Sequence, residues 1–307
     1  MSEIKNKPIY VIGSSNTDMV VKTPRLPSTG ETILGDNFLM VPGGKGANQA
    51  VASSRLGGQV IFVGNVGNDV FGEGAIEGLN REDINCDFIG RDQSLPSGVA
   101  LIIVDDHGEN QIVVASGANN SLSPAQVDEA LSNAPEEAII LTQLEIPLVT
   151  ISHIIDIAKE KKFRVILDPA PAPPDGLSAE IIEGSYLITP NETEAKLLTG
   201  IDVIDENSAL KASKILLDAG AKNIIVTMGA NGSLLSNLSG SQFFASSKVK
   251  AIDSTAAGDC FNGALATLLS QGHSLADSIS FANRAAAVSV TRMGAQTSLP
   301  FVDEVKN

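Results

Sequence analysis

The sequence has few of the residues on which several common classes of site depend. Two cysteines, three histidines and no tryptophan occur among its 307 residues. Cys86 and Cys260 lie far apart in no CxxC or CxxH pattern, so neither a disulfide framework nor a zinc site is expected, and Cys260 is interpreted as a buried structural thiol. The histidines form no motif that would support a Ser-His-Asp mechanism.

Long apolar runs and clusters of positive charge are also missing. No run of 18 apolar residues occurs, and the polar stretch 1–8 contains no apolar signal core, so we expect a cytoplasmic protein. The formal net charge is −15, and no Lys/Arg cluster interrupts it, so neither nucleic acid nor an anionic membrane is expected as a partner. An anionic ligand would have to be held by local features.

The remaining pattern is that of a globular α/β protein, with 43% hydrophobic and 19% charged residues. Buried strands alternate with helical segments, which predicts a doubly wound, mostly parallel sheet flanked by helices. We find no linker and expect a single domain over 1–307. The predicted strands are 8–14, 59–65, 138–143, 164–168, 186–189, 223–228 and 233–236, and the predicted helices begin near 43, 67, 147, 176, 192, 206, 261 and 274.

Two separated segments break this alternation. Short stretches at 19–23, 31–34 and 37–41 are divided by Pro and Gly, and a hairpin is predicted from 99–104 and 111–115. Together they predict a small antiparallel β lid, inserted from about 17–42 and 97–117, that covers the ligand edge of the sheet.

The stretch Asp253–Asp259 follows a predicted short strand at 248–252 and opens a helix. Backbone amides at a helix start lack intrahelical partners, so Ala256, Ala257 and Gly258 are placed to bind an anion. Asp259 beside them is placed to take the proton from an incoming hydroxyl group. The alternative interpretation is a carboxylate that only caps the helix.

Polar residues follow the first strand and open the first helix. Asn16 and Asp18 lie where ligands meet a parallel sheet, and a carboxylate suits two neighbouring hydroxyls of a sugar, although an Asx turn is the alternative. The segment 43–48 is not a Walker A loop, because Gly46 stands where Ser or Thr would follow Lys45. Its glycines allow close approach of a ligand, and Lys45 and Asn48 offer donors.

Further candidates follow later strands. Glu145 and Asp168 each follow a buried strand, and Glu194 can face a hydrated Mg²⁺, or serve only in a capping box with Asn191. The segment 227–232 leaves room for a nucleotide, but a hairpin turn needs its glycines equally.

With GGKGAN at 43–48, ITPNETE at 188–194 and DSTAAGD at 253–259, in that order, the chain resembles the ribokinase (PfkB) family of carbohydrate kinases almost end to end. The resemblance implies a doubly wound sheet of about nine strands and a β lid that also forms a homodimer contact. It further implies phosphorylation of D-ribose at its 5-hydroxyl by ATP. Ser254 replaces the usual Thr, Ala256 stands where many relatives have Gly, and a terminal helix found in some relatives is expected to be short or absent.

The resemblance also implies roles for individual residues, with Asp259 as general base and the amides of Ala256, Ala257 and Gly258 as anion hole. The implied sugar-binding residues are Asn16, Thr17, Asp18, Gly44, Lys45, Gly46, Ala47, Asn48, Glu145 and Asp259. The implied nucleotide-binding residues are Asn191, Thr227, Met228, Gly229, Ala230, Asn231, Gly232, Gly258, Asp259 and Asn283. A K⁺ site is implied at Asp253, Thr255, Ser289, Arg292, Gly294 and Ser298, and Glu194 is implied to act on Mg²⁺ through water.

Rival functions stay open at this point. A kinase of the same family acting on fructose, a nucleoside or a keto-deoxy sugar acid is the nearest one. Aromatic residues are only 4% of the chain, which disfavours a base-stacking pocket for a nucleoside. Arg25 is the single arginine between 16 and 48, which disfavours a sugar acid as the substrate. A non-catalytic sugar sensor is disfavoured by the intact 253–259 stretch.

Overall fold

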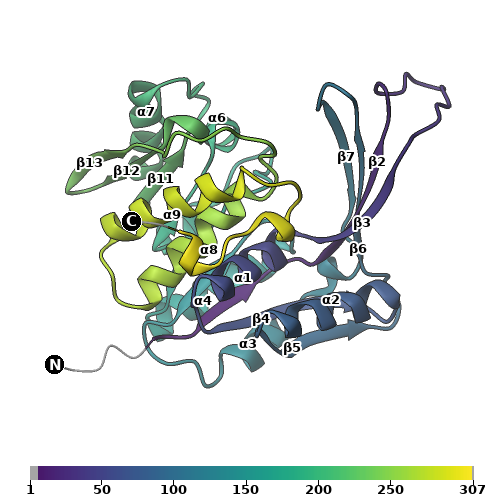
Figure 1. Cartoon of the computed structure of the whole chain (residues 1–307). Helices are drawn as coiled ribbons and strands as arrows, with labels where there is room; N and C mark the ends of the chain where they lie inside the picture. The colour runs from purple at the N-terminus through teal and green to yellow at the C-terminus, as the bar shows by residue number, and fades with distance from the viewer. Residues whose placement is uncertain (1–5, 306–307) are drawn as a thin grey trace.

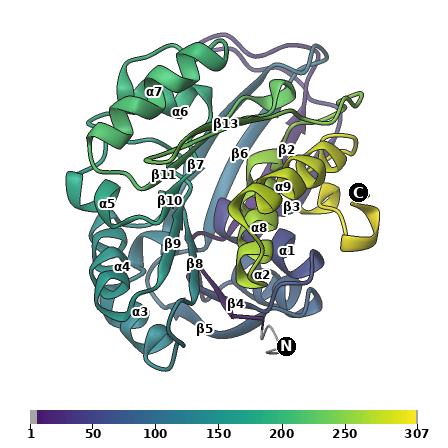
Figure 2. The ribbon, with the colours of Figure 1, turned by 90° about the vertical axis from the view of Figure 1, so that its left-hand side faces the viewer.

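The computed structural model describes residues 6–305, in which a nine-stranded sheet lies between two layers of helices (Figure 2). The strand order is β13-β12-β11-β10-β9-β8-β1-β4-β5, and only the pairs β11–β12 and β12–β13 are antiparallel. The predicted α/β class with a doubly wound, mostly parallel sheet is therefore confirmed. The strands are β1 (Ile9–Ile12), β4 (Val60–Gly67), β5 (Asn85–Asp92), β8 (Ile139–Thr142), β9 (Arg164–Leu167), β10 (Leu187–Ile188), β11 (Asn223–Thr227), β12 (Ser233–Asn237) and β13 (Gly240–Phe244).

Both faces of the sheet are buried, and alternate residues of β1 serve the two cores. Ile9 and Val11 pack in one cluster with side chains of α1, α8 and α9, whereas Tyr10 and Ile12 pack in another with side chains of α3 and α4. Figure 2 shows α3 to α7 on one side of the sheet and α1, α2, α8 and α9 on the other. The helices are α1 (Lys45–Arg55), α2 (Val70–Arg81), α3 (Pro124–Leu131), α4 (Leu148–Lys161), α5 (Ala179–Gly184), α6 (Glu192–Thr199), α7 (Glu206–Asp218), α8 (Ala257–Ser270) and α9 (Leu275–Ser289).

A second, four-stranded sheet projects from this body (Figure 1). Its order is β3-β2-β6-β7, and the β6–β7 hairpin confirms the predicted one. We call this sheet the lid. Its strands are β2 (Asn16–Lys22), β3 (Phe38–Gly43), β6 (Gly98–Val104) and β7 (Asn110–Ala115).

Some local predictions were wrong. The stretch 248–252 is not a strand but part of an exposed connection between β13 and α8, because no neighbouring strand lies beside it to pair with. The stretch 31–34 likewise forms no strand and belongs to the loop between β2 and β3. Strands β5 and β13 and helix α3 had not been predicted. At the C-terminus a short 3₁₀ turn, Val302–Glu304, stands where a terminal helix was expected to be short or absent.

The direction of chain winding reverses at β1, because β4 and β5 lie on one side of it and β8 to β13 on the other. Ligands bind beyond the carboxyl ends of strands at such a switch point. The lid begins four residues after β1, so its root lies at this edge. The predictions made for 1–5 and 306–307 lie outside the described residues. Within 6–305, no helix has the length and apolar character needed to span a bilayer.

Candidate active site

Asp259 lies in the first turn of α8, but it does not cap the helix. The N-cap residue is Ala256, in the left-handed region with φ 59°, and no side chain caps the helix start. The Asp259 carboxylate instead accepts hydrogen bonds from Asn48 Nδ2 at 2.9 Å and Gln49 Nε2 at 3.0 Å. The interpretation of Asp259 as a capping residue is therefore wrong, and its side chain belongs to a buried network with α1.

The predicted anion hole lies beside this carboxylate. Gly258 is exposed, and its N–H has no hydrogen-bond partner among residues 6–305. The N–H of Ala257 donates to the Ser254 carbonyl at 3.2 Å. The amide most open to a ligand in this structure is therefore that of Gly258, with Ala256 and Ala257 half-buried next to it.

The electrostatics of this region are dominated by carboxylates around Lys45. Burial raises the pKa of Asp259, whereas Lys45 and the hydrogen bonds from Asn48 and Gln49 oppose that rise. Burial would lower the pKa of Lys45, but four carboxylates outweigh it and hold the ammonium group charged. These four are Asp259, Asp168, Glu145 and Glu194.

Asp18 faces the same cluster from the lid. A Cβ at Gly43, which lies diagonally across from Asp18 on β3, would be 2.2 Å from Asp18 Oδ1, so only glycine leaves room for this carboxylate. The pKa of Asp18 is raised to about 6 by burial and by the negative charges of Glu145 and Asp259. The carboxyl groups of Asp18 and Asp259 therefore share one region, as the sequence predicted.

Glu145, which follows β8, fixes the start of α1. Its Oε2 accepts hydrogen bonds from Ser14 Oγ and from the Lys45 backbone N–H, the latter at 3.0 Å. Gly44 precedes the helix with φ 88°, a conformation that favours glycine. The predicted residues Gly44, Lys45 and Glu145 are thus brought together by backbone contacts.

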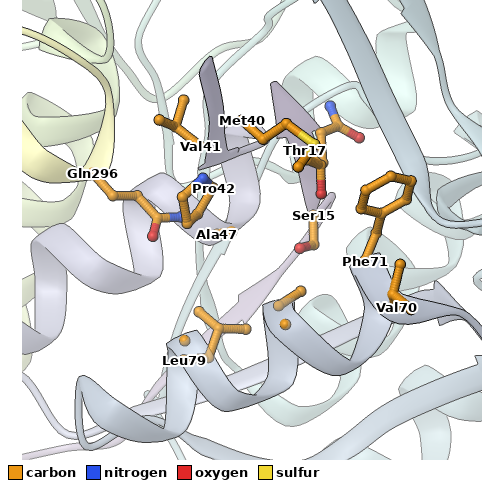
Figure 3. Close-up of a pocket in the computed structure, with 14 residues that line it drawn as sticks. Ser15, Thr17, Met40, Val41, Pro42, Ala47, Val70, Phe71, Leu79 and Gln296 are labelled. Carbon is orange, nitrogen blue, oxygen red and sulfur yellow. The ribbon is translucent and has the colours of Figure 1, made fainter. Parts of the chain in front are cut away.

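Asn16 and Thr17 begin β2, and both border the same small cavity. Asn16 is buried, and its Oδ1 accepts from Asn119 Nδ2 at 2.8 Å. Thr17, on the face opposite Asp18, lines a mostly apolar cavity of about 190 Å³ between the lid root and α2. Figure 3 shows Phe71 and Met40 beside Thr17 in this cavity, which Ala47 also lines.

On the predicted nucleotide side, Asn191 and Glu194 form a complete capping box at the start of α6. Glu194 uses both oxygens on Asn191, at 2.9 and 3.0 Å. Asn191 also forms a β-bridge with Thr227. The turn 229–231 is exposed and ends at Gly232, with φ 102°, while Met228 is buried. Asn283 is buried on α9 and donates to Ser233 Oγ at 3.0 Å and to the Phe244 carbonyl at 3.3 Å.

The predicted cation loops meet at Asp253. Its Oδ1 accepts from the Thr255 backbone N–H at 2.9 Å and from Thr255 Oγ1 at 2.6 Å, while its Oδ2 accepts from the Gly294 N–H at 2.8 Å. Ser289 and Ser298, which lie on either side of Gly294 in the sequence, are both buried. The Arg292 guanidinium pairs with Glu304. Among residues 6–305, no cluster of three or more His, Cys, Asp or Glu side chains with metal-binding geometry occurs.

The structure adds two residues to the candidate set from the middle of the fold. Gln49 and Gln143 are fully buried, and Gln143 donates to Gln49 Oε1 at 2.6 Å. Gln49 also donates to Asp168 at 2.7 Å, which gives that strand-end carboxylate a partner. A sequence signal was present, because a long polar side chain at 49 interrupts the small apolar residues Ala47, Ala50 and Val51.

The chain as a whole is similar to known proteins. The family model described as pfkB family carbohydrate kinase matches residues 6–302. The ribokinase of Haemophilus influenzae is 42% identical over 294 residues, which make up 96% of this chain and 95% of that protein.

Two solved structures are similar over nearly the whole chain. The ribokinase of Thermotoga maritima has a TM-score of 0.86 and 41% identity, and covers 97% of both chains. The ribokinase of Arabidopsis thaliana, complexed with ribose and ATP, has a TM-score of 0.89 and 30% identity, with 97% of both chains covered. The chain therefore belongs to the pfkB family of carbohydrate kinases.

Proposed function

We propose that this enzyme transfers the γ-phosphoryl group of ATP to the 5-hydroxyl of D-ribose, with Asp259 as the general base. The observation that carries the proposal is the carboxylate of Asp259, which is buried, held by Asn48 and Gln49, and adjacent to the open amide of Gly258. A base beside an anion-binding helix start can remove the hydroxyl proton while the amides stabilise charge on the phosphoryl group. The similarity to ribokinases supports ribose as the acceptor.

The sugar would lie between the lid and α1. Asp18 offers two acceptor oxygens to a pair of hydroxyls, and Lys45 offers a donor. Asn48 Oδ1 is buried without a hydrogen-bond partner among the described residues, which is costly unless a ligand supplies one. A sugar hydroxyl would satisfy it. Asn16 presents its amide nitrogen, because its oxygen is already used by Asn119.

ATP would approach the carboxyl ends of β10 and β11 and the start of α8. The exposed turn 229–231 and Asn191 border that space. Asn283 contributes indirectly, because its hydrogen bonds hold β12 and the end of β13 in place. In this proposal the chain itself does little covalent chemistry. It positions two substrates and excludes water from them.

The residues present fit the two metal ions that the family implies. Carboxylate, hydroxyl and carbonyl oxygens are the donors that hard cations prefer, and Asp253 joins the two loops that would supply them to K⁺. Glu194 is a single carboxylate already bonded to Asn191, which suits a contact through water to Mg²⁺. When bound, these cations would offset the carbonyl dipoles of the loops and the negative charge of the phosphates.

We also propose a single domain over 1–307 that forms a homodimer through the lid. Apolar side chains are exposed on the lid, among them Phe38 at 57%, Leu101 at 52% and Val113 at 65%. Met19 pairs with Leu101, which pairs with Val113, so the three share the face opposite Asp18. An exposed apolar patch of this kind marks an interface, and a second lid would cover it.

Kinases acting on fructose, a nucleoside or a sugar acid remain the alternatives, and a sugar sensor without catalysis is a further one. A panel of these acceptors, assayed with ATP and Mg²⁺ in the presence and absence of K⁺, separates them. We expect ribose to give the highest kcat/KM and K⁺ to increase it. If fructose or adenosine gave a higher kcat/KM than ribose, the proposed substrate would be wrong. If no acceptor reacted, the alternative of a sugar sensor without catalysis would be favoured.

A further inference from the structure

Gln49 lies on the inner face of α1 and contacts the proposed base from the side that faces away from solvent. It is fully buried, one residue after Asn48. Its Nε2 carries two N–H groups, and both are used, one on Asp259 Oδ1 at 3.0 Å and one on Asp168 Oδ2 at 2.7 Å. Its Oε1 accepts from Gln143 at 2.6 Å. The side chain is thus fixed at three points.

The orientation of this amide is determined by its partners. The nitrogen of Gln49 faces Asp168 and Asp259 and its oxygen faces Gln143, which is the orientation that suits carboxylates acting as hydrogen-bond acceptors. A flipped amide would direct a carbonyl oxygen at two carboxyl groups. Gln49 cannot rotate without losing all three contacts.

The two oxygens of Asp259 are divided between neighbouring residues of α1. Asn48 donates to Oδ2 and Gln49 donates to Oδ1, so the plane of the carboxylate is defined from both sides. Asn48 faces the proposed sugar site, whereas Gln49 is anchored to β8 and β9 through Gln143 and Asp168. The carboxylate is therefore connected to the central sheet through Gln49.

We propose that Gln49 is a positioning residue for Asp259, and that Asp168 and Gln143 act through it by fixing the side chain of Gln49. This inference rests on the proposed function of Asp259 as base. The groups that share the surroundings of Asp259 are Lys45, Asp18, Glu145, Asp168 and Glu194. None of the anchoring residues needs to contact a substrate in this arrangement.

The first test replaces Gln49 by methionine, which has a similar size but no amide. We expect Gln49→Met to lower kcat about 10- to 100-fold, since small displacements of a reacting group are costly, and to leave the sugar KM within about threefold. Ser53→Ala is the matched control, because Ser53 lies one turn further along α1 and bonds Gln49 O and Gly263 O but not Asp259. That variant should keep kcat.

The second test concerns the anchor. Asp168→Asn retains an acceptor for Gln49 and should keep kcat within about threefold, whereas Asp168→Ala removes the acceptor and should lower it. In the double variant Gln49→Met/Asp168→Ala, kcat should be no lower than in Gln49→Met alone, because both changes disrupt the same positioning of Asp259 by Gln49. Multiplying losses would mean independent roles and would overturn the proposal.

A third measurement does not depend on turnover. A donor to a carboxylate favours its ionised form, so Gln49→Met should raise the pH at which the Asp259 carboxyl resonance titrates, by about one pH unit. The acid limb of kcat should move to higher pH by the same amount. An unchanged titration and unchanged kcat, with only a lower Tm, would make Gln49 a packing residue. A wild type inactive on every acceptor would reject the proposed function, while the titration would still decide the role of Gln49.

Discussion

The folded state disfavours the negative charge of Asp18. Replacing this residue should therefore raise the stability of the protein while it weakens sugar binding. The pKa of its carboxyl is about 6, compared with an ordinary 3.8, because of burial and the charges of Glu145 and Asp259. At 1.36 kcal/mol for each pH unit, the difference corresponds to about 3 kcal/mol against the ionised form. Because the side chain is half-buried, solvent screening reduces this to about 1–2 kcal/mol.

We therefore expect Asp18→Asn to stabilise the protein without ligand by about 1–2 kcal/mol at pH 7.5, which is about 2–4 °C in Tm for a chain of this size. The sign follows from proton binding. Between pH 4 and 6 the folded state binds more protons at Asp18 than the unfolded state, so wild-type stability falls as pH rises through that window. The gain in the variant should be about half as large at pH 5 and absent below pH 4.

Thermal unfolding at pH 5, 6 and 7.5, with and without saturating ribose, measures both effects. Ribose should stabilise the wild type more than the variant, because the amide that replaces the carboxylate has lost charge-assisted hydrogen bonds worth about 1.5–3 kcal/mol each. Asp36→Asn, an exposed change in the lid loop, is the control for a general reduction of negative charge. A variant that is no more stable at pH 7.5, or one whose gain does not change with pH, would refute this reasoning.

Asp259→Asn should fold normally and bind the sugar while kcat falls about 10²- to 10⁴-fold, and near-normal turnover would reject Asp259 as the base. Asp253→Ala should remove the difference in kcat between K⁺ and Li⁺ buffers, since the carboxylate joins the two loops; retained K⁺ activation would place the cation elsewhere. Val113→Asp should shift the protein to a monomer in light scattering, whereas Asn110→Asp, an exposed change on the opposite face of the same strand, should not. Asn283→Ala should raise the KM for ATP more than that for ribose, and an equal change in both would contradict its place on the nucleotide side.

Much of the fold was predictable because its signals are local. Buried apolar runs, helix starts and the lid hairpin are visible over five to ten residues, and the central strands were placed within a few residues. The stretch 248–252 shows the limit of that approach. Its alternation suits a strand, but a strand also needs a partner, and β13 has already taken the edge position.

The site was predictable to the extent that its residues belong to short motifs or strand ends. Asp18, Asp259 and Glu145 were predicted in that way. Gln49 and Asn119 were not, because their roles depend on contacts between segments more than a hundred residues apart. The capping alternative for Asp259 could be rejected only once the structure showed that α1 supplies its partners.

Four carboxylates act on Lys45, so the proposed sugar site carries more negative than positive charge. A neutral sugar can enter it without electrostatic cost, whereas a phosphorylated sugar would add about two further negative charges at close range. Repulsion would then favour departure of the product as soon as the nucleotide and its cations loosen their hold. The residues that bind the sugar would thus also favour release of the phosphorylated product.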